Sequence, residues 1–196
     1  MSRILTPQQK IERSIVTDFR RDIWNKFVMG YERYDMIKPG DKIAVCISGG
    51  KDSMLLAKCM QHLQKYQGMD IGLEFIVMNP GYSDANRQRI IDNAKLMGIP
   101  IKMFETKVFD IAYNTKRNPC YLCARMRRGY LYNFAKQLGC NKIALGHHYD
   151  DVIETIGRFG SGHIGGAMSV MDALTVIYYA KANVDPKNPK KFDRDR

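Results

Sequence analysis

The stretch from Ile43 to Ser53 constrains the fold of this 196-residue chain more than any other. Its first part, Ile43–Ile47, is a continuous apolar run, which is typical of a strand buried on both faces. A six-residue turn, Ser-Gly-Gly-Lys-Asp-Ser, follows directly. From Met54 to Tyr66 the apolar residues then recur at helical spacing. A strand, a glycine turn and a helix in immediate succession predict an α/β domain.

The six-residue turn has the properties of an anion-binding loop. It lies between a strand end and a helix start, where backbone N–H groups and the helix dipole can hold a phosphate. Gly49 and Gly50 permit the backbone conformations that such a loop requires, and Lys51 adds a positive charge. Asp52 would repel a bare phosphate, so we expect it to cap the helix or to hold Mg²⁺ beside the phosphates. The Walker A spacing is absent, and the structural alternative is an ordinary Gly-Gly turn.

The remaining pattern predicts a parallel sheet. Further strands are expected at 73–78, 101–104 and 142–145, and helices at 86–97 and 126–138. Strands that alternate with helices imply right-handed crossovers, and ligands of such sheets bind beyond the carboxyl ends of the strands. Ser48, Asn79 and Glu105 all fall at such ends. Before the sheet, Thr6 and Pro7 begin a helix whose apolar stripe holds Ile11, Ile15, Phe19, Ile23, Phe27 and Val28.

Cys120 and Cys123 form a C-x-x-C motif, whose thiolates can reach one metal ion or cluster. A thioredoxin-type redox pair and two buried cysteines are the alternatives. The neighbouring cations would lower the pKa of the thiols and could bind RNA phosphates; they are Lys116, Arg117, Arg125, Arg127 and Arg128. We expect the other three cysteines, Cys46, Cys59 and Cys140, in or near the core.

A third polar block, Gly146-His147-His148-Tyr149-Asp150-Asp151, follows the fourth predicted strand. Its histidines and carboxylates suggest metal binding, and capping of the next helix by Asp150 is the structural alternative. Taken with the other two motifs, the block favours a functional site.

The amino-acid composition restricts the kinds of binding partner that the chain can have. A net charge of +11 and a pI near 9.5 favour a polyanion such as nucleic acid, although a solvated basic surface would give the same numbers. No apolar run approaches the ~20 residues of a membrane span, and the first residues do not form a secretory leader. Five cysteines are too few for a disulfide scaffold, so we expect a cytoplasmic protein without membrane contact.

With these motifs in place, the chain resembles the PP-loop ATP pyrophosphatases. Over residues 8–156 the resemblance is closest to the tRNA 2-thiocytidine synthetases (TtcA-like), in the order and spacing of the three motifs. It implies an adenine-nucleotide α-hydrolase-like α/β fold of Rossmann-like type. It also implies an enzyme that adenylates the C2 oxygen of a tRNA cytidine with ATP and releases pyrophosphate. A sulfur nucleophile then displaces AMP.

The resemblance also implies site residues. ATP and Mg²⁺ would be bound by Ser48, Gly49, Gly50, Lys51, Asp52, Ser53, Asn79, Gly146, His147 and Asp151. Lys51, Asp52, Cys120 and Cys123 would act in catalysis, the two cysteines as ligands of a [4Fe-4S] cluster. The family holds that cluster with three cysteines, and this chain has none after Cys140. The family often has Asp at the position of Asn79. The implied partners are tRNA and a sulfur donor such as a cysteine desulfurase, and a homodimer is allowed.

Three segments are expected: an N-terminal helical segment at 1–40, a truncated PP-loop domain at 41–159 and a foreign helical tail at 160–196. The tail resembles a short N-terminal piece of transketolase, in which the histidine matched by His163 positions thiamine diphosphate. We expect no transketolase activity. The alternatives for the whole chain are a uridine thiolase, a lysidine-type ligase, or a nucleotide- and RNA-binding remnant without activity.

Overall fold

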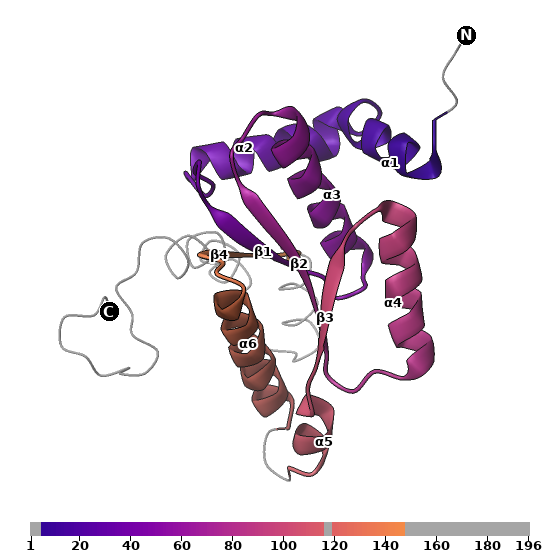
Figure 1. The fold of residues 1–196 in the computed structure, drawn as a ribbon, viewed down its shortest axis with the longest axis vertical. Helices are drawn as coiled ribbons and strands as arrows, with labels where there is room; N and C mark the ends of the chain where they lie inside the picture. Colours follow the sequence, from indigo (N-terminus) through magenta and orange to yellow (C-terminus); the bar gives the residue numbers. More distant parts are fainter. Residues whose placement is uncertain (1–4, 116–118, 148–196) are drawn as a thin grey trace, which may run out of the picture. The chain divides into compact units, whose positions relative to one another are not determined.

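The computed structural model describes residues 5–115 and 119–147. The described residues fall into two units, one with residues 5–31 and the described part of 37–146, the other with Glu32–Met36 and His147. The described elements are α1 (Pro7–Val16), the π-helix η1 (Arg20–Trp24), α2 (Asn25–Arg33), β1 (Lys42–Cys46), α3 (Lys51–Tyr66), β2 (Gly72–Asn79), α4 (Asp84–Met97), β3 (Ile101–Glu105), α5 (Val108–Tyr113), α6 (Pro119–Gln137) and β4 (Lys142–Leu145) (Figure 1).

The four strands form one parallel sheet in the order β3-β2-β1-β4. Cys46 lies opposite Ile76 on one side and Leu145 on the other, so β1 is a central strand. The chain steps from β1 outward to β3 and then returns past β1 to form β4. The strand order therefore reverses between β1 and β4, which is where open α/β sheets bind ligands. The predicted α/β fold with a parallel sheet is confirmed.

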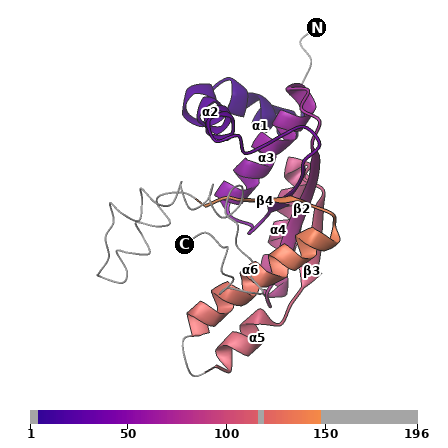
Figure 2. The same ribbon diagram turned by 90° about the vertical axis from the view of Figure 1, so that its left-hand side faces the viewer.

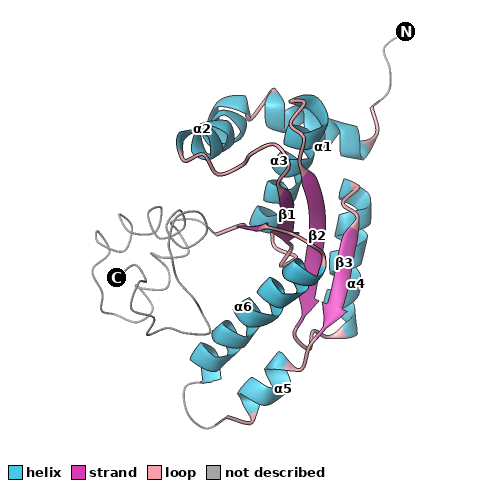
Figure 3. Ribbon diagram, turned by 60° about the vertical axis from the view of Figure 1, so that its left-hand side comes forward, coloured by secondary structure: helices cyan, strands magenta, loops and turns pink. Residues whose placement is uncertain are grey.

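Helices cover the sheet because its strands carry apolar side chains on both faces. Ala44, Cys46 and Ile76 form a buried cluster with Ala135 of α6. The intervening strand residues Ile43, Val45, Phe75 and Val77 are also buried, and alternation places them on the opposite face. Figure 3 shows α6 crossing in front of the sheet and α4 behind it, as right-handed crossovers require.

The element boundaries differ most from prediction around α6. The strand predicted at 142–145 matches β4, and the other predicted strands agree with β1, β2 and β3 to within one residue at each end. The predicted 126–138 helix, however, begins at Pro119, so Cys120 and Cys123 lie in its first turns. Pro119 is suited to the first helical position, because its missing N–H is not needed there. The short helix α5 was not predicted.

The prediction of the N-terminal helix is correct at the start of the helix and wrong in its continuation. Thr6 and Gln9 form a capping box, and Pro7 is the first helical residue. The helix then ends at Val16 and resumes through η1, so the single stripe predicted to Val28 is broken. Phe19, a member of that stripe, is 51% exposed.

A buried ion pair joins the N-terminal helix to the domain. The side chain of Lys58 in α3 is fully buried, and its Nζ lies 2.6 Å from Oε1 of Glu12 in α1. The same ammonium donates to Gln61 Oε1 at 2.8 Å and to the carbonyl of Met97, at the end of α4, at 2.9 Å. A buried charge is tolerated only with such partners, so three helices are tied together at Lys58.

No helix in the described part of the chain is both long and apolar enough to cross a membrane. The helical tail predicted at 160–196 lies outside the described residues.

Candidate functional site

Ser53 organises the turn between β1 and α3. Its hydroxyl accepts the N–H of Ser48 at 3.2 Å, lies 3.1 Å from the Ser48 hydroxyl and donates to the Gly50 carbonyl at 2.9 Å. The residue is 4% exposed. Two predicted site residues, Ser48 and Ser53, are therefore brought together, and in the structure they hold the loop in shape.

Gly49 must be glycine for two independent reasons. Its φ of +89° is in the left-handed region that other residues rarely adopt. A Cβ at this position would lie 2.7 Å from Cγ1 of Ile90, a buried residue of α4. Sequence reasoning found Gly49 but missed Ile90, because nothing local in the α4 sequence marks the residue that packs under the loop.

The loop leads directly into the N-terminus of α3. Gly50 is the N-cap and no side chain caps the helix there. Asp52 lies in the first turn and is not the N-cap; its other predicted role, at a Mg²⁺ ion, stays a prediction. Its carboxylate instead contacts Lys51, whose Nζ lies 3.1 Å from both oxygens. The Lys51 side chain is 87% exposed.

Gly146 at the end of β4 closes the other side of the loop. A Cβ on Gly146 would lie 2.9 Å from the Ser53 nitrogen and 3.0 Å from its Cα. Backbone cannot move aside as a flexible side chain can, so only glycine lets β4 end against the start of α3. The residue predicted from the third motif thus meets the residues of the first motif at the reversal of the strand order. His147 follows it and is exposed, and Asp151 lies outside the described residues.

Asn79 has a structural role that explains its burial. It ends β2, where its Oδ1 accepts the N–H groups of Gly81 at 3.1 Å and Tyr82 at 2.7 Å. Its carbonyl accepts the N–H of Thr106 beyond β3 at 2.8 Å. The side chain thus shapes the turn at the carboxyl edge, a role that the nucleotide-binding prediction for Asn79 did not include. Tyr82 in this turn packs edge-on against Phe109 of α5, a pair that sequence reasoning missed because α5 carries no strong helical signal.

The cysteines separate into two groups. Burial raises the pKa of Cys46 to about 12 and that of Cys59 to about 11, and it also raises the pKa of Cys140. Burial thus disfavours the thiolate form of these three residues, as expected for core or near-core positions. Cys123 is half-buried in α6, one helical turn after Cys120.

The C-x-x-C motif lies toward the carboxyl edge of the sheet, which is also the edge at which the loop lies. Figure 3 shows the strand arrowheads pointing toward α5 and toward the end of α6 where its helix begins. Leu131, Phe134 and Leu138 of α6 pack on the core. Arg127 is four residues before Leu131, and Cys123 is four residues before Arg127, so all of them fall on one stripe of the helix. Cys123 therefore lies on the continuation of the sheet-facing stripe toward the start of α6. Among the described residues no three His, Cys, Asp or Glu side chains gather as a metal site.

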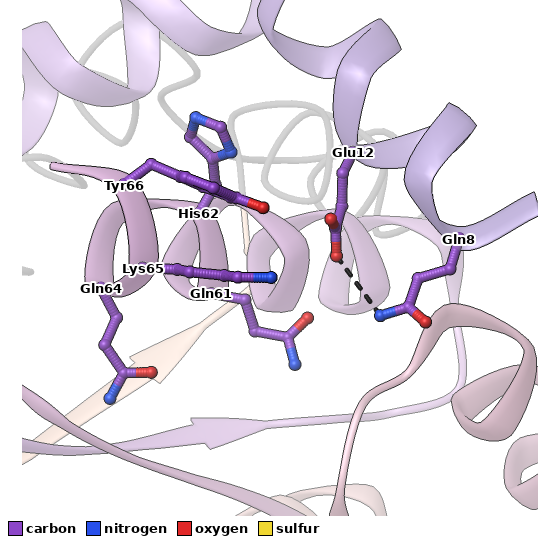
Figure 4. Close-up of a pocket in the computed structure, with 7 residues that line it drawn as sticks. All are labelled: Gln8, Glu12, Gln61, His62, Gln64, Lys65 and Tyr66. Atoms are coloured by element: carbon purple, nitrogen blue, oxygen red, sulfur yellow. Dashed lines mark hydrogen bonds between the residues drawn. The ribbon is translucent and has the colours of Figure 1, made fainter. Parts of the chain in front are cut away.

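A surface pocket of about 380 Å³ lies elsewhere, at the far end of α3 (Figure 4). It is lined by Gln8, Glu12, Gln61, His62, Gln64, Lys65 and Tyr66. Because α3 has 16 residues, its two ends are about 24 Å apart. The pocket is therefore separate from the loop site.

Comparison with known proteins agrees with the loop geometry. A family model described as a PP-loop domain matches residues 18–176. The chain belongs to the PP-loop domain family. The match continues past the boundary predicted at residue 159, and both that boundary and the transketolase resemblance of the tail stay predictions.

Two curated relatives of this PP-loop chain are tRNA-cytidine(32) 2-sulfurtransferases. The protein from Pelobacter propionicus is 41% identical over 127 residues, which cover 63% of this chain and 47% of the relative. The protein from Neisseria meningitidis serogroup A is 38% identical over 144 residues, covering 70% of this chain and 44% of the relative. The chain thus spans less than half the length of these relatives.

A solved structure shares the fold. The U34-tRNA thiolase NcsA from Methanococcus maripaludis, determined with its [4Fe-4S] cluster, aligns with a TM-score of 0.51 at 25% identity. The alignment covers 69% of this chain and 50% of that protein.

Proposed function

We propose that this PP-loop chain binds ATP at Ser48–Ser53 and adenylates the C2 oxygen of a cytidine in tRNA, the activating half of 2-thiocytidine synthesis. The observation that carries the proposal is the contact of Gly146 with the start of α3, which encloses the glycine loop at the reversal of the strand order. The two sulfurtransferase relatives support the choice of tRNA and of cytidine. Because the chain spans less than half of their length, the complete reaction is part of the proposal.

The loop supplies electrostatic stabilisation. Phosphate oxygens would accept hydrogen bonds from the backbone at the start of α3, and the exposed Lys51 would offset the charge that develops as pyrophosphate leaves. Adenylation is needed because a carbonyl oxygen is a poor leaving group, whereas AMP is a good one. Asp52, beside Lys51, is the residue that would hold a Mg²⁺ ion accompanying ATP, which would supply further positive charge.

The cysteines do not complete a cluster of the family type. Cys120 and Cys123 are suited to two of its three ligands, but Cys46 and Cys59 are buried in the core and Cys140 follows the opposite end of α6. We therefore derive no step through a [4Fe-4S] cluster. In the proposed reaction the sulfur comes from a donor protein such as a cysteine desulfurase. The proposed reaction takes place in the cytoplasm. A homodimer of the chain is compatible with this reaction.

Product analysis tests the adenylation step. ATP is incubated with the chain under anaerobic conditions, with and without bulk tRNA, and sulfide is then added as the nucleophile. We expect pyrophosphate only when tRNA is present, AMP once sulfide displaces it from the adenylated base, and loss of both products in Lys51→Ala. Lys65→Ala, at the other end of α3, is the matched control and should behave as the unchanged protein. ADP and phosphate as products would contradict the proposal, whereas bound ATP without turnover would assign the chain to the inactive remnants.

A uridine thiolase is the second candidate, and the similarity to the archaeal U34-tRNA thiolase favours it. Nucleoside mass spectrometry of the tRNA after reaction distinguishes the two, because the adenylated or thiolated base is then a uridine rather than a cytidine. The C-x-x-C motif argues against a lysidine-type ligase, which needs no such pair.

A further inference from the structure

The net positive charge of the chain comes largely from one segment, in which acidic residues are scarce. Between Thr106 and His147 there are eight Lys or Arg residues and a single acidic residue, Asp110. Helix α6 lies within this segment and has no acidic residue in its 19 positions. A helix on an ordinary solvated surface usually mixes both signs of charge, so this concentration calls for a partner of opposite charge.

Three of the four cations of α6 lie outside the stripe of the helix that packs on the sheet, and the fourth, Arg127, lies within that stripe. Its inward stripe is fixed by Leu131, Phe134 and Leu138, which pack on the core. The outward face of α6, as we define it, consists of Arg125, Arg128, Tyr132 and Lys136, all of them exposed. They follow one another at spacings of three or four residues, so they form one stripe along the helix. Figure 2 shows α6 running along the edge of the fold, with α5 beside its first turns.

Ion pairs within the described part of the chain do not neutralise this stripe. Among the described residues, the salt bridges involve cations of α3, α4 and the strands, and none of them involves Arg125, Arg128 or Lys136. Within residues 5–115 and 119–147, Arg128 Nε donates to the carbonyl of Ala124 on the same helix, at 3.4 Å. Their charges contribute little to the fold and are available to an external anion.

Aromatic rings accompany the cations. Tyr132 is 39% exposed within the stripe, and Tyr113, at the end of the adjacent helix α5, is 93% exposed. A tyrosine exposed to this degree is poorly explained by packing. Cations with interspersed aromatic rings are typical of surfaces that bind single-stranded or looped RNA, where cations contact phosphates and rings stack on bases.

We propose that the outward face of α6 is the surface on which the RNA backbone lies. This inference rests on the proposed function for the identity of the RNA, but it assigns the contact to residues outside the nucleotide loop. The same helix carries Cys123 at its start, so an RNA held along the stripe reaches the carboxyl edge of the sheet, where the loop lies.

The test compares two double variants with the same loss of charge. Arg125→Gln/Arg128→Gln alters the outward face of α6, and Lys10→Gln/Arg13→Gln alters the exposed face of α1. Affinity for bulk tRNA is measured by fluorescence anisotropy at several salt concentrations. We expect the α6 variant to lose at least tenfold in affinity at low salt and the α1 variant less than threefold. The slope of log K against log salt should flatten by about 0.7 to 0.9 for each phosphate contact removed.

ATP binding, measured separately with a non-hydrolysable analogue, should be equal in both variants, so a failure of the nucleotide proposal does not affect this result. Equal loss of tRNA affinity in the two variants would mean that only the net charge of the protein matters, and this would overturn the inference. Reduced binding of a poly-glutamate peptide with unchanged tRNA binding would mark a surface for an acidic protein, and would also overturn it.

Discussion

Single residues set the geometry of the PP-loop, and Gly49 is the most constrained of them. Its left-handed backbone and its contact with Ile90 are separate requirements, and they can be measured separately. Gly40 has almost the same φ, +85°, but nothing lies within 4 Å of the place where its Cβ would be. The pair therefore distinguishes backbone strain from steric contact.

We expect Gly40→Ala to lower the free energy of unfolding by about 1 kcal/mol through strain alone. Gly49→Ala should cost about 2–4 kcal/mol, because the contact with Ile90 adds to the strain. Urea denaturation of both variants measures the difference. Measured against Ile90→Ala alone, Gly49→Ala/Ile90→Ala should show only the strain cost, because the clashing atoms are gone. An equal effect of Gly40→Ala and Gly49→Ala would contradict a steric role for Ile90.

His62 makes stability depend on pH. Burial lowers the pKa of His62, Glu12 opposes this shift, and the charges of Lys58 and Lys65 add to it. Its Nδ1 is buried without a hydrogen-bond partner, and its ring lies between those of Trp24 and Tyr66. The folded state therefore prefers the neutral imidazole more than the unfolded state does.

Because the folded-state pKa lies below the ordinary value of 6.5, this contribution is complete above pH 6.5 and is lost as the pH falls through the lower pKa. We expect the urea midpoint to fall between pH 7.5 and 5.5 in the unchanged protein, and to fall less in His62→Phe. His147→Gln, which replaces an exposed histidine, serves as the control. A midpoint that drops equally in all three proteins would exclude His62 as the cause.

At the scale of elements, the ion pair between Glu12 and Lys58 attaches the N-terminal helix to the sheet domain. Removal of one partner of a buried pair leaves an uncompensated charge, which costs about 3–5 kcal/mol, whereas exposed pairs contribute about 0–1 kcal/mol. Lys51 and Asp52 form such an exposed pair in the same helix, with side chains 87% and 38% exposed.

We therefore expect Lys58→Met to lower the free energy of unfolding by about 3 kcal/mol and Lys51→Met by less than about 1 kcal/mol. Replacing both partners, in Glu12→Leu/Lys58→Met, should restore most of the loss. The hydrogen bond and charge of Lys58 hold the pKa of Glu12 below its usual value against the opposing effect of burial. The pair should therefore stabilise fully above pH 4.5 and weaken as the pH falls through that lower pKa.

Element prediction from the sequence worked where the signal was local. The run Ile43–Ile47 and the glycine turn after it gave β1 and the loop, because continuous burial and helix starts leave a strong pattern. Helix α5 and the early start of α6 were missed, because a six-residue helix has little periodicity. The broken N-terminal helix could not be read either, since Phe19 and Ile15 are equally apolar and only packing makes one exposed and the other buried.

At the scale of the whole molecule, the site depends on contacts between distant parts of the sequence. The contact of Gly146 with Ser53 joins the last described strand to the first helix of the sheet, and the sequence shows only that both contain suggestive motifs. Strand order decides that they meet, and strand order is a property of the complete sheet. The turn-forming role of Asn79 could not be predicted for the same reason, because its hydrogen-bond partners are known only from the structure.

Gly146→Ala tests this closure. The new Cβ would lie about 3 Å from the backbone of Ser53, so we expect a loss of about 2 kcal/mol or more in stability and weaker ATP binding. Gly30→Ala is the control, because nothing surrounds its Cβ position and alanine is favoured within helix α2. Unchanged stability in Gly146→Ala would mean that β4 does not end against α3.

The position of Gly146 also bears on synthesis of the chain. The loop at Ser48–Ser53 leaves the ribosome first, and the strand that closes it follows roughly 90 residues later, which takes about 5–20 s at ~5–20 residues per second. During this interval β1 has no partner on its β4 side, and the apolar residues of that edge are open to incorrect pairing. Under the proposed function, ATP would bind only after β4 has joined the sheet, and the nascent chain stays open to misfolding until then.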